Sequence, residues 1–331
     1  MIPVTNPSRQ SWRQELTEAI TDPADLLRVL ELDPGLITAA QAAAELFPLR
    51  APRGFVARMR KGDPHDPLLR QVLPLGAETT TASGFMDDPV GEVQAMPVPG
   101  LLHKYHGRVL LIATGACAIH CRYCFRRAFP YAKAGTTDWR SMLSYLNQDA
   151  SLSEVILSGG DPLVLSDGRL AKMIVGLGAI PHLRRLRIHS RLPVVLPERV
   201  DQGLLALLKR SRLQPVMVLH ANHPQEIDEA AGAAITRLRS AGVSLFNQAV
   251  LLKGVNDSAA ILAELSETLF SFGVIPYYLH LLDRVRGAAH FEVAEDQAVA
   301  IMAALRRRLP GYLAPRLVRE QAGAAAKIPV L

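Results

Sequence analysis

The sequence predicts an α/β protein whose core is a partial (β/α)6 barrel, TIM-like but left open. From residue 101 onward, short apolar runs alternate with stretches of helical pattern. The runs that we expect to form strands are residues 109–114, 154–158, 185–189, 216–219, 244–250 and 275–280. Helical crossovers between them imply parallel strands with the functional site at their carboxyl ends. Six such units are too few to close an eight-stranded barrel.

We interpret the chain as three segments: a mostly helical wrapping segment at 1–100, the partial barrel at 101–300 and a C-terminal segment at 301–331. In the first segment, Ser11 and Gln14 have the spacing of a capping box, and Pro23 marks a break between helices. Residues 290–309 have the pattern of one further amphipathic helix.

Composition bounds the class of protein. With 331 residues, 49% hydrophobic and 21% charged, the chain resembles an ordinary globular enzyme. It has neither a membrane-spanning apolar run nor a signal-peptide layout, so we expect a cytoplasmic protein that does not bind membranes. The net charge of +6 is spread along the chain, which does not favour nucleic-acid binding.

The three cysteines of the chain carry its most specific motif. Cys117, Cys121 and Cys124 follow the first expected strand with the spacing C-x3-C-x2-C. Thiolates select iron–sulfur clusters or zinc, and three of them can hold three irons of a [4Fe–4S] cluster. The fourth iron is then open to a ligand, an arrangement that is typical of radical S-adenosylmethionine (SAM) enzymes, which the spacing and Tyr123 resemble.

The alternative for the same motif is a structural zinc site with His120 as fourth ligand. Because His120 directly precedes Cys121, and zinc ligands usually come from two separated pairs, we favour the cluster. A disulfide framework is disfavoured by the odd number of cysteines and by the length of the chain.

Polar residues follow the other expected strands. The sequence SGGDPL at 158–163 places Gly159, Gly160 and Asp161 where a backbone can approach a ligand closely, although the same residues also favour a simple turn. His189, Arg191, His220, Asn222, His223, Asn247 and Gln248 end later strands. Such residues are candidates to line a pocket, although any single one can have only a structural hydrogen bond.

Near the C-terminus, Lys327 follows a run of small residues at 322–326. A lysine with so little steric hindrance can reach a ligand and form a Schiff base with an aldehyde. A lysine near a chain end is, however, usually only a solvated charge.

Several of these stretches together resemble the lysine 2,3-aminomutase family of radical SAM enzymes. They are the cysteine motif at 117–127, SGGDPL at 158–163, LHANHPQEI at 219–227, LLKGVND at 251–257, PYYLHLLD at 276–283 and GAAAKIPV at 323–330. Within the family, the chain is most similar to the members that supply β-lysine for modification of elongation factor P. The N-terminal stretch SWRQELTEAITDPADLL and the four residues after Lys327 carry that similarity.

The resemblance implies roles for particular residues. Cys117, Cys121 and Cys124 would bind a [4Fe–4S] cluster, and Lys327 would bind pyridoxal 5′-phosphate (PLP) covalently as the catalytic lysine. The residues implied in cofactor binding are Lys104, Tyr105 and Arg108 for PLP, and Gly159, Gly160, Asp161, His220 and Gln248 for SAM. Arg126 would bind the substrate α-carboxylate, and Asp283 with Glu320 would receive its ε-ammonium. Position 320 is typically aspartate in free-lysine enzymes.

The resemblance also implies the activity: isomerisation of L-α-lysine to β-lysine. It implies a reductant such as flavodoxin or ferredoxin, and a pathway link to elongation factor P and its lysylating synthetase. Two alternatives stay open at this point. One is a radical SAM enzyme that acts on another amino acid or on a protein-bound lysine, and the other is a non-catalytic iron–sulfur or zinc protein.

Overall fold

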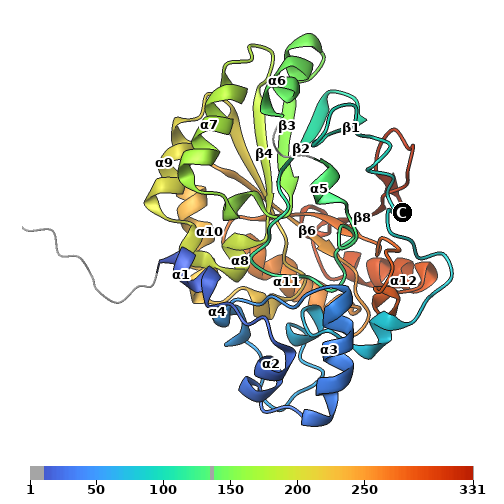
Figure 1. Cartoon of the computed structure of the whole chain (residues 1–331). Helices are drawn as coiled ribbons and strands as arrows, with labels where there is room; N and C mark the ends of the chain where they lie inside the picture. Colours follow the sequence, from blue (N-terminus) through green and yellow to red (C-terminus); the bar gives the residue numbers. More distant parts are fainter. Residues whose placement is uncertain (1–10, 135–137, 331) are drawn as a thin grey trace, which may run out of the picture.

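A curved sheet of nine strands forms the centre of the computed structural model, which describes residues 11–134 and 138–330 (Figure 1). The strands lie in chain order: β1 (Leu101–Tyr105), β2 (Arg108–Thr114), β3 (Glu154–Gly159), β4 (Arg185–Ser190), β5 (Gln214–Leu219), β6 (Ser244–Val250), β7 (Ile275–His280), β8 (Arg316–Arg319) and β9 (Ile328–Pro329). Strands β2 to β8 are parallel, and β1 and β9 add antiparallel edges.

All six expected strands are confirmed, and the sheet stays open as predicted. One further parallel strand, β8, was not expected: it pairs with β7 and extends the sheet. Its partner β9 ends two residues after Lys327. The parallel sheet therefore carries Lys327 at its edge, beside the carboxyl ends of the strands.

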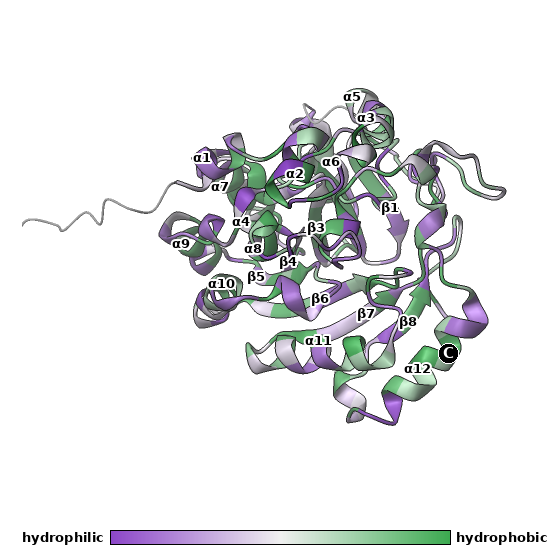
Figure 2. Cartoon of the chain, turned by 90° about the horizontal axis from the view of Figure 1, so that it is seen from below, coloured by the Kyte–Doolittle hydropathy of each residue, from purple (hydrophilic) through white to green (hydrophobic). Residues whose placement is uncertain are grey.

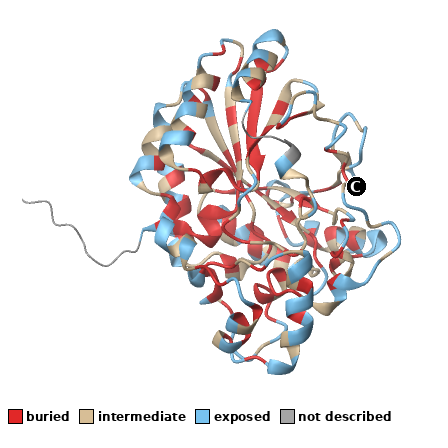
Figure 3. Cartoon of the chain, in the orientation of Figure 1, coloured by how far each residue is buried: buried red, intermediate tan, exposed pale blue. Residues whose placement is uncertain are grey.

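Helices connect the parallel strands and cover the outer face of the sheet (Figures 1 and 2). The longer ones are α6 (Trp139–Gln148), α7 (Asp167–Gly178), α9 (Gln202–Arg210), α10 (Glu229–Ser240), α11 (Ala259–Ser271) and α12 (Glu295–Arg306). Their inner faces pack on buried residues of the strands, which are red in Figure 3, and β3 is buried along its whole length. In the described ranges, no helix has the length and apolar character that crossing a bilayer requires.

The N-terminal segment folds into short helices: α1 (Trp12–Thr17), α2 (Pro23–Val29), α3 (Ile37–Leu46) and α4 (Arg53–Val56). Ser11 caps α1 and accepts from the Gln14 amide at 3.3 Å, but the expected capping box is only half formed, because the Gln14 side chain donates to Glu18 at 3.0 Å. Helix α2 begins at Pro23, which supplies the favoured backbone angle for a first turn. The segment packs against loops at the carboxyl ends of the strands, since the amides of His120 and Arg122 donate to the Arg50 and Gln71 carbonyls.

A buried charge cluster joins this segment to the cysteine loop. Glu78 is buried and accepts from Arg122 Nη2 at 2.6 Å and from Arg127 Nη2 at 2.8 Å. Arg122 itself has no exposed surface, and its guanidinium also donates to the Phe47 carbonyl at 2.6 Å. Because Arg122 and Arg127 both bind this one carboxylate, Glu78 fixes the position of the N-terminal segment against the cysteine loop.

We therefore expect Glu78→Gln to lower the free energy of unfolding by ~3–5 kcal/mol, since it leaves two buried guanidinium charges without their counter-ion. Urea denaturation of the purified chain measures this loss. The matched control is Glu31→Gln, which breaks the exposed pair between Glu31 and Lys61 and should cost less than ~1 kcal/mol. Equal losses in the two variants would contradict the role given to Glu78.

Candidate active site

The three cysteines lie on the loop that leaves β2. All three are half-buried free thiols, and the Cys124 amide donates to the Cys121 carbonyl at 3.0 Å, which makes the loop turn tightly. Among residues 11–134 and 138–330, no three cysteine, histidine or acidic side chains converge on a single-ion position. A cubic cluster places each thiolate on a different iron, and three cysteines on one loop can supply those three ligands.

His120, the fourth ligand of the zinc alternative, is engaged elsewhere. Its Nδ1 lies 2.8 Å from the Pro48 carbonyl oxygen, and its ring stacks on Phe47 with centroids 5.2 Å apart. Burial raises the pKa of Cys124 to about 11, with the nearby Cys121 adding to the effect. Burial likewise raises the pKa of Cys117. The thiols of Cys117 and Cys124 therefore carry protons at neutral pH, which binding of iron would displace.

The glycines that follow β3 let the cysteine loop lie close to the sheet. Gly159 has φ 113°, and a Cβ at Gly160 would lie 2.2 Å from the Ala116 carbonyl oxygen. The Gly160 and Asp161 amides donate to the Thr114 and Ala116 carbonyls at 2.7 and 2.8 Å. The motif thus joins the cysteine loop to the end of β3, which is where a ligand of the cluster would lie.

Asp161 has a different position from the one that the sequence suggests. Its buried carboxylate accepts from Ser190 Oγ at 2.8 Å and from the amides of Arg191, Leu192 and Leu163. Burial raises the pKa of Asp161 to about 6. With four protein donors on its two oxygens, the side chain ties the loops after β3 and β4 together and has little capacity for a ligand.

One cavity of about 370 Å³ gathers most of the other expected residues at the carboxyl ends of the strands. Its lining includes Lys104, Tyr105, Arg108, Arg126, His220, Gln248, Asp283, Glu320 and Lys327. The cysteines, Gly159, Gly160 and Asp161 do not line it. The volume is within the range of sites for small molecules and cofactors.

Glu320 holds two lysines inside this cavity. Its Oε1 accepts from Lys104 Nζ at 2.8 Å and its Oε2 accepts from Lys327 Nζ at 2.6 Å. Although burial opposes ionisation, these two ammonium groups lower the pKa of Glu320 to about 2. Lys104 also donates to the Val90 carbonyl at 2.7 Å. Without a ligand, Glu320 is the counter-ion of the two lysines.

Asp283 is the second carboxylate of the expected pair, and it differs from Glu320 in its partners and in its pKa. In the part of the chain that the structure describes, its side chain has no hydrogen bond or ion pair. Burial, followed by the negative charge of Glu320, raises the pKa of Asp283 to about 7. A cationic ligand that reached Asp283 would therefore supply the partner that it lacks.

This pKa predicts how stability depends on pH. An unfolded aspartate ionises near ~3.9, so between about pH 4 and 7 the unfolded chain gives up a proton that folded Asp283 keeps. The carboxyl therefore costs stability as pH rises through this window, and the cost is constant above it. We expect Asp283→Asn to unfold at a higher temperature than the wild type at pH 8, with a gain of about 4 kcal/mol, and to show little difference at pH 4.

Thermal unfolding of both chains from pH 4 to 8 measures this difference. The exposed Asp87 provides the control, since Asp87→Asn should show no such growth with pH. A constant difference between Asp283→Asn and the wild type across the window would contradict the raised pKa.

Arg126 is buried at the inner wall of the cavity and is strongly held. Its Nε and Nη2 donate to the two Glu92 oxygens at 2.7 and 2.6 Å, and its Nη1 donates to Ser158 Oγ and the Gly159 carbonyl. These contacts use four of its five N–H groups, which leaves one on Nη2 for a ligand. A substrate carboxylate could take two bonds only by displacing Glu92.

Three histidines add polar atoms to the cavity wall. The Nε2 atoms of His189 and His280 are buried and, among the described residues, have no hydrogen-bond partner. His220 Nε2 lies 3.0 Å from Gln248 Nε2. Burial lowers the pKa of His220 to about 3 and those of His189 and His280 well below their usual value. At neutral pH each ring therefore offers one donor and one acceptor to a polar ligand.

Arg108 completes the fit of this cavity to PLP. Its guanidinium lies 4.7 Å from the Tyr105 ring centroid and, among the described residues, has no ion-pair partner. A free cation suits a phosphate, the Lys327 amine suits an aldehyde, and the unpartnered histidine nitrogens suit polar groups of a bound ring. The side chains present therefore fit PLP in the cavity and a cluster on the cysteine loop.

The sequence analysis missed Glu92 and His280. Glu92 lies in the proline-rich stretch before β1, where no motif marks it, and its partner Arg126 is 34 residues away. His280 ends β7, so its place at the carboxyl end of an expected strand was the signal that could have identified it.

Comparisons with known proteins give relatives along the whole chain. It is 49% identical over 333 residues to the L-lysine 2,3-aminomutase of Escherichia coli K12, covering 100% of this chain and 97% of that protein. It is 48% identical to the L-lysine 2,3-aminomutase of Haemophilus influenzae, covering 95% and 94% of the two chains. The enzyme of that name from Clostridium subterminale is 34% identical, covering 99% of this chain and 79% of the relative.

No protein-family model matches the chain. Among solved structures, a radical SAM methyltransferase from Sphaerobacter thermophilus aligns with a TM-score of 0.46 and 17% identity, covering 66% of this chain and 68% of that one. A likeness of this size carries no weight, and the assignment rests on the sequence relatives.

The open parallel barrel, its three-cysteine loop and the adjoining glycine motif have the arrangement that the sequence analysis expects of a radical SAM protein. By its identity to relatives of nearly full length, the chain belongs to the L-lysine 2,3-aminomutase family.

Proposed function

We propose that this protein is an isomerase that converts L-α-lysine to β-lysine with a [4Fe–4S] cluster, SAM and PLP. The observation that carries the proposal is that one cavity collects the Lys327 amine, the free Arg108 cation and the acidic pair Asp283 and Glu320. An amine for the cofactor aldehyde, a cation for its phosphate and two carboxylates for a side-chain ammonium are what a lysine-specific PLP enzyme needs.

When bound, a cluster with SAM would supply hydrogen-abstracting radical chemistry, and PLP would supply an aldehyde for the amino group. The protein would position and enclose the reactants. Cys117, Cys121 and Cys124 would hold the cluster, and the loop at Gly159 and Gly160 would contact SAM. The weaker candidates for SAM contacts are His220 and Gln248, and Asp161 supports the loop from within.

In the PLP part of the cavity, Lys327 binds the aldehyde and Arg108 receives the phosphate, with Tyr105 packed on Arg108 and Lys104 nearby. Lys104 is tied to Glu320 and the Val90 carbonyl, so its contact with the phosphate requires release of those bonds.

The two ends of the substrate are held by opposite charges. Arg126 presents its remaining N–H to the α-carboxylate, while Asp283 and Glu320 receive the ε-ammonium. Binding a cation gives Asp283 the partner that it lacks, and favours its ionised form at neutral pH. Fixing both ends leaves the β-carbon in one place, and such positioning can contribute ~7–11 kcal/mol to catalysis.

The experiment that tests the function is an anaerobic assay of the reconstituted chain with L-lysine, SAM, PLP and dithionite, in which mass spectrometry follows β-lysine. We expect β-lysine only when both SAM and PLP are present. SAM cleavage without β-lysine would show that the substrate is wrong, and a panel of other amino acids and lysyl peptides then identifies the alternative. A fully loaded cluster with neither reaction would overturn the proposal.

The partners and location in this proposal follow from the chemistry and the family. A one-electron donor such as flavodoxin or ferredoxin would reduce the cluster, and a reducing cytoplasm suits free thiols and the cluster. We propose that the product supplies the modification of elongation factor P through its lysylating synthetase. Loss of β-lysyl groups from elongation factor P in a strain without this gene would test that link.

A further inference from the structure

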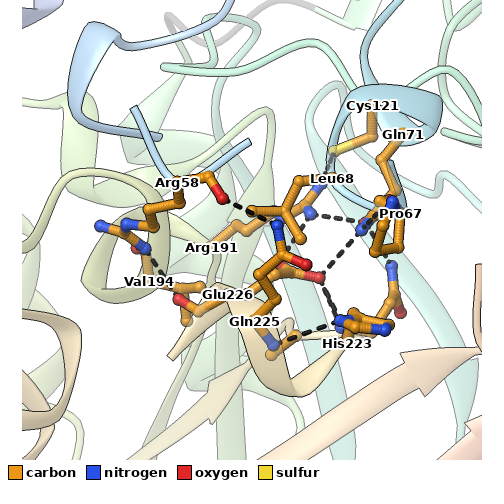
Figure 4. A network of polar contacts seen from close by, with 12 residues as sticks. Arg58, Pro67, Leu68, Gln71, Cys121, Arg191, Val194, His223, Gln225 and Glu226 are labelled. Atoms are coloured by element: carbon orange, nitrogen blue, oxygen red, sulfur yellow. Dashed lines mark hydrogen bonds and ion pairs between the residues drawn. The ribbon is translucent and has the colours of Figure 1, made fainter. Parts of the chain in front are cut away.

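Arg191 is a buried cation that touches a cysteine of the cluster loop. It is the first residue after β4 and is 4% exposed. Its Nη1 donates to the Cys121 sulfur at 2.8 Å, and its Nη2 donates to Gln71 Oε1 at 2.6 Å and Glu226 Oε2 at 2.8 Å. The close-up in Figure 4 shows the guanidinium between Cys121, Gln71 and Glu226.

The surrounding groups fix this guanidinium. Asp161 accepts from the Arg191 amide at 2.8 Å and so holds the start of the side chain. Glu226 is completely buried and also accepts from Gln71 Nε2 and from the Asn222 and His223 amides. Gln71, which also donates to the Pro67 carbonyl, and Glu226 are therefore themselves held, and they fix the guanidinium whose Nη1 donates to the sulfur.

A hydrogen bond from a fixed cation to a cluster sulfur acts on electron density at the irons. The reduced cluster carries one more negative charge than the oxidised cluster, so a nearby positive charge stabilises the reduced form more. Burial strengthens this effect because little water screens it. The negative charge of Glu226, 2.8 Å from the same guanidinium, opposes this stabilisation of the reduced cluster.

We propose that Arg191, balanced by Glu226, sets the reduction potential of the cluster that Cys121 helps to hold. Arg191 is a positioning residue that acts through the Cys121 sulfur and does not touch the substrate. The inference rests on the cluster of the proposed function and adds to it a charge pair that controls how readily the cluster accepts the electron needed for SAM cleavage.

The two members of the pair predict shifts of opposite sign. Arg191→Gln removes the cation and should make the midpoint potential of the reconstituted cluster more negative. Glu226→Gln removes the opposing anion and leaves the cation, so it should make the potential more positive. A merely structural role would not produce opposite signs, because damage to the network in either variant would loosen the same loop.

The measurement is an anaerobic potentiometric titration of each reconstituted full-length chain, followed by the electron paramagnetic resonance signal of the reduced cluster, with iron analysed per chain. Arg58 provides the matched control: its Nη1 donates to the Val194 and Glu226 carbonyls, and it contacts no cysteine. Arg58→Gln should leave the potential at the wild-type value.

Unchanged potentials in both variants of the pair, with wild-type iron content, would overturn this inference alone. If Arg191→Gln does not retain iron, Glu226→Gln decides the question, because a potential that fails to rise overturns the inference. A wild-type chain that takes up no iron would overturn the proposed function itself.

Discussion

The Lys327→Ala variant is expected to lose β-lysine formation by at least about 10³-fold, because the alanine has no amine with which to hold PLP in position. It should also lose the visible absorbance of lysine-bound PLP. The [4Fe–4S] cluster should remain at wild-type iron content, since the cysteine loop and the Lys327 segment hold separate groups. Spectra, iron analysis and β-lysine assays of the same preparation measure all three.

Two other lysines make this prediction specific. Lys253 lines an open groove next to the cavity and not the cavity itself, so Lys253→Ala should keep both the absorbance and the turnover. Lys104 shares Glu320 with Lys327 but has no role in covalent binding, so Lys104→Ala should weaken PLP retention and keep the covalent bond. Borohydride reduction followed by peptide mapping identifies the modified lysine. A phosphopyridoxyl group on Lys104 or Lys253 in the wild type would refute the assignment to Lys327.

The barrel was predictable because each central strand carries a short apolar pattern between helical stretches. Strand β3 is buried throughout, whereas β4 and β6 alternate buried and half-buried residues, and all six expected segments became strands β2 to β7. Strand β8 was missed because only Leu317 and Val318 are apolar between Arg316 and Arg319, which is too short a signal. Only pairing with β7, formed in the folded chain, makes that segment a strand.

The positions of the site residues were predictable, but their partners were not. Strand ends and motifs placed Lys327, Asp283, Glu320 and Arg108 in one region, and the structure brings them to one cavity. Arg191 was expected to line a pocket, yet its guanidinium is bonded to Cys121 and Glu226. The position at the end of a strand could be predicted for Arg191, but it fixes only where the side chain begins. The buried Glu226 and Gln71 determine where its charged group lies.

Arg126 illustrates the same limit for the substrate. The family resemblance implies that Arg126 binds a carboxylate, but the sequence gives no sign that Glu92 already accepts from its Nε and Nη2. The two residues come from different segments, and only folding of the proline-rich stretch over the cavity brings them together.

The second large effect concerns the cluster itself. Replacing Cys121 by alanine removes one of three thiolates and the sulfur that Arg191 contacts, so the cluster should not assemble with its open iron in place. We expect iron content well below four per chain and loss of SAM cleavage to the level of the protein-free control. Anaerobic reconstitution, iron and sulfide analysis and detection of 5′-deoxyadenosine measure the outcome.

The neighbouring residue His120 is the control that separates a cluster from a zinc site. Its ring nitrogen is bonded to the Pro48 carbonyl, so His120→Ala should retain full iron content even if the chain becomes somewhat less stable. A structural zinc site would instead lose its metal equally in both variants and bind zinc in preference to iron. Iron near four per chain in Cys121→Ala would contradict the ligand assignment. Equal metal loss in Cys121→Ala and His120→Ala would favour the zinc site, because only there is His120 a metal ligand like Cys121.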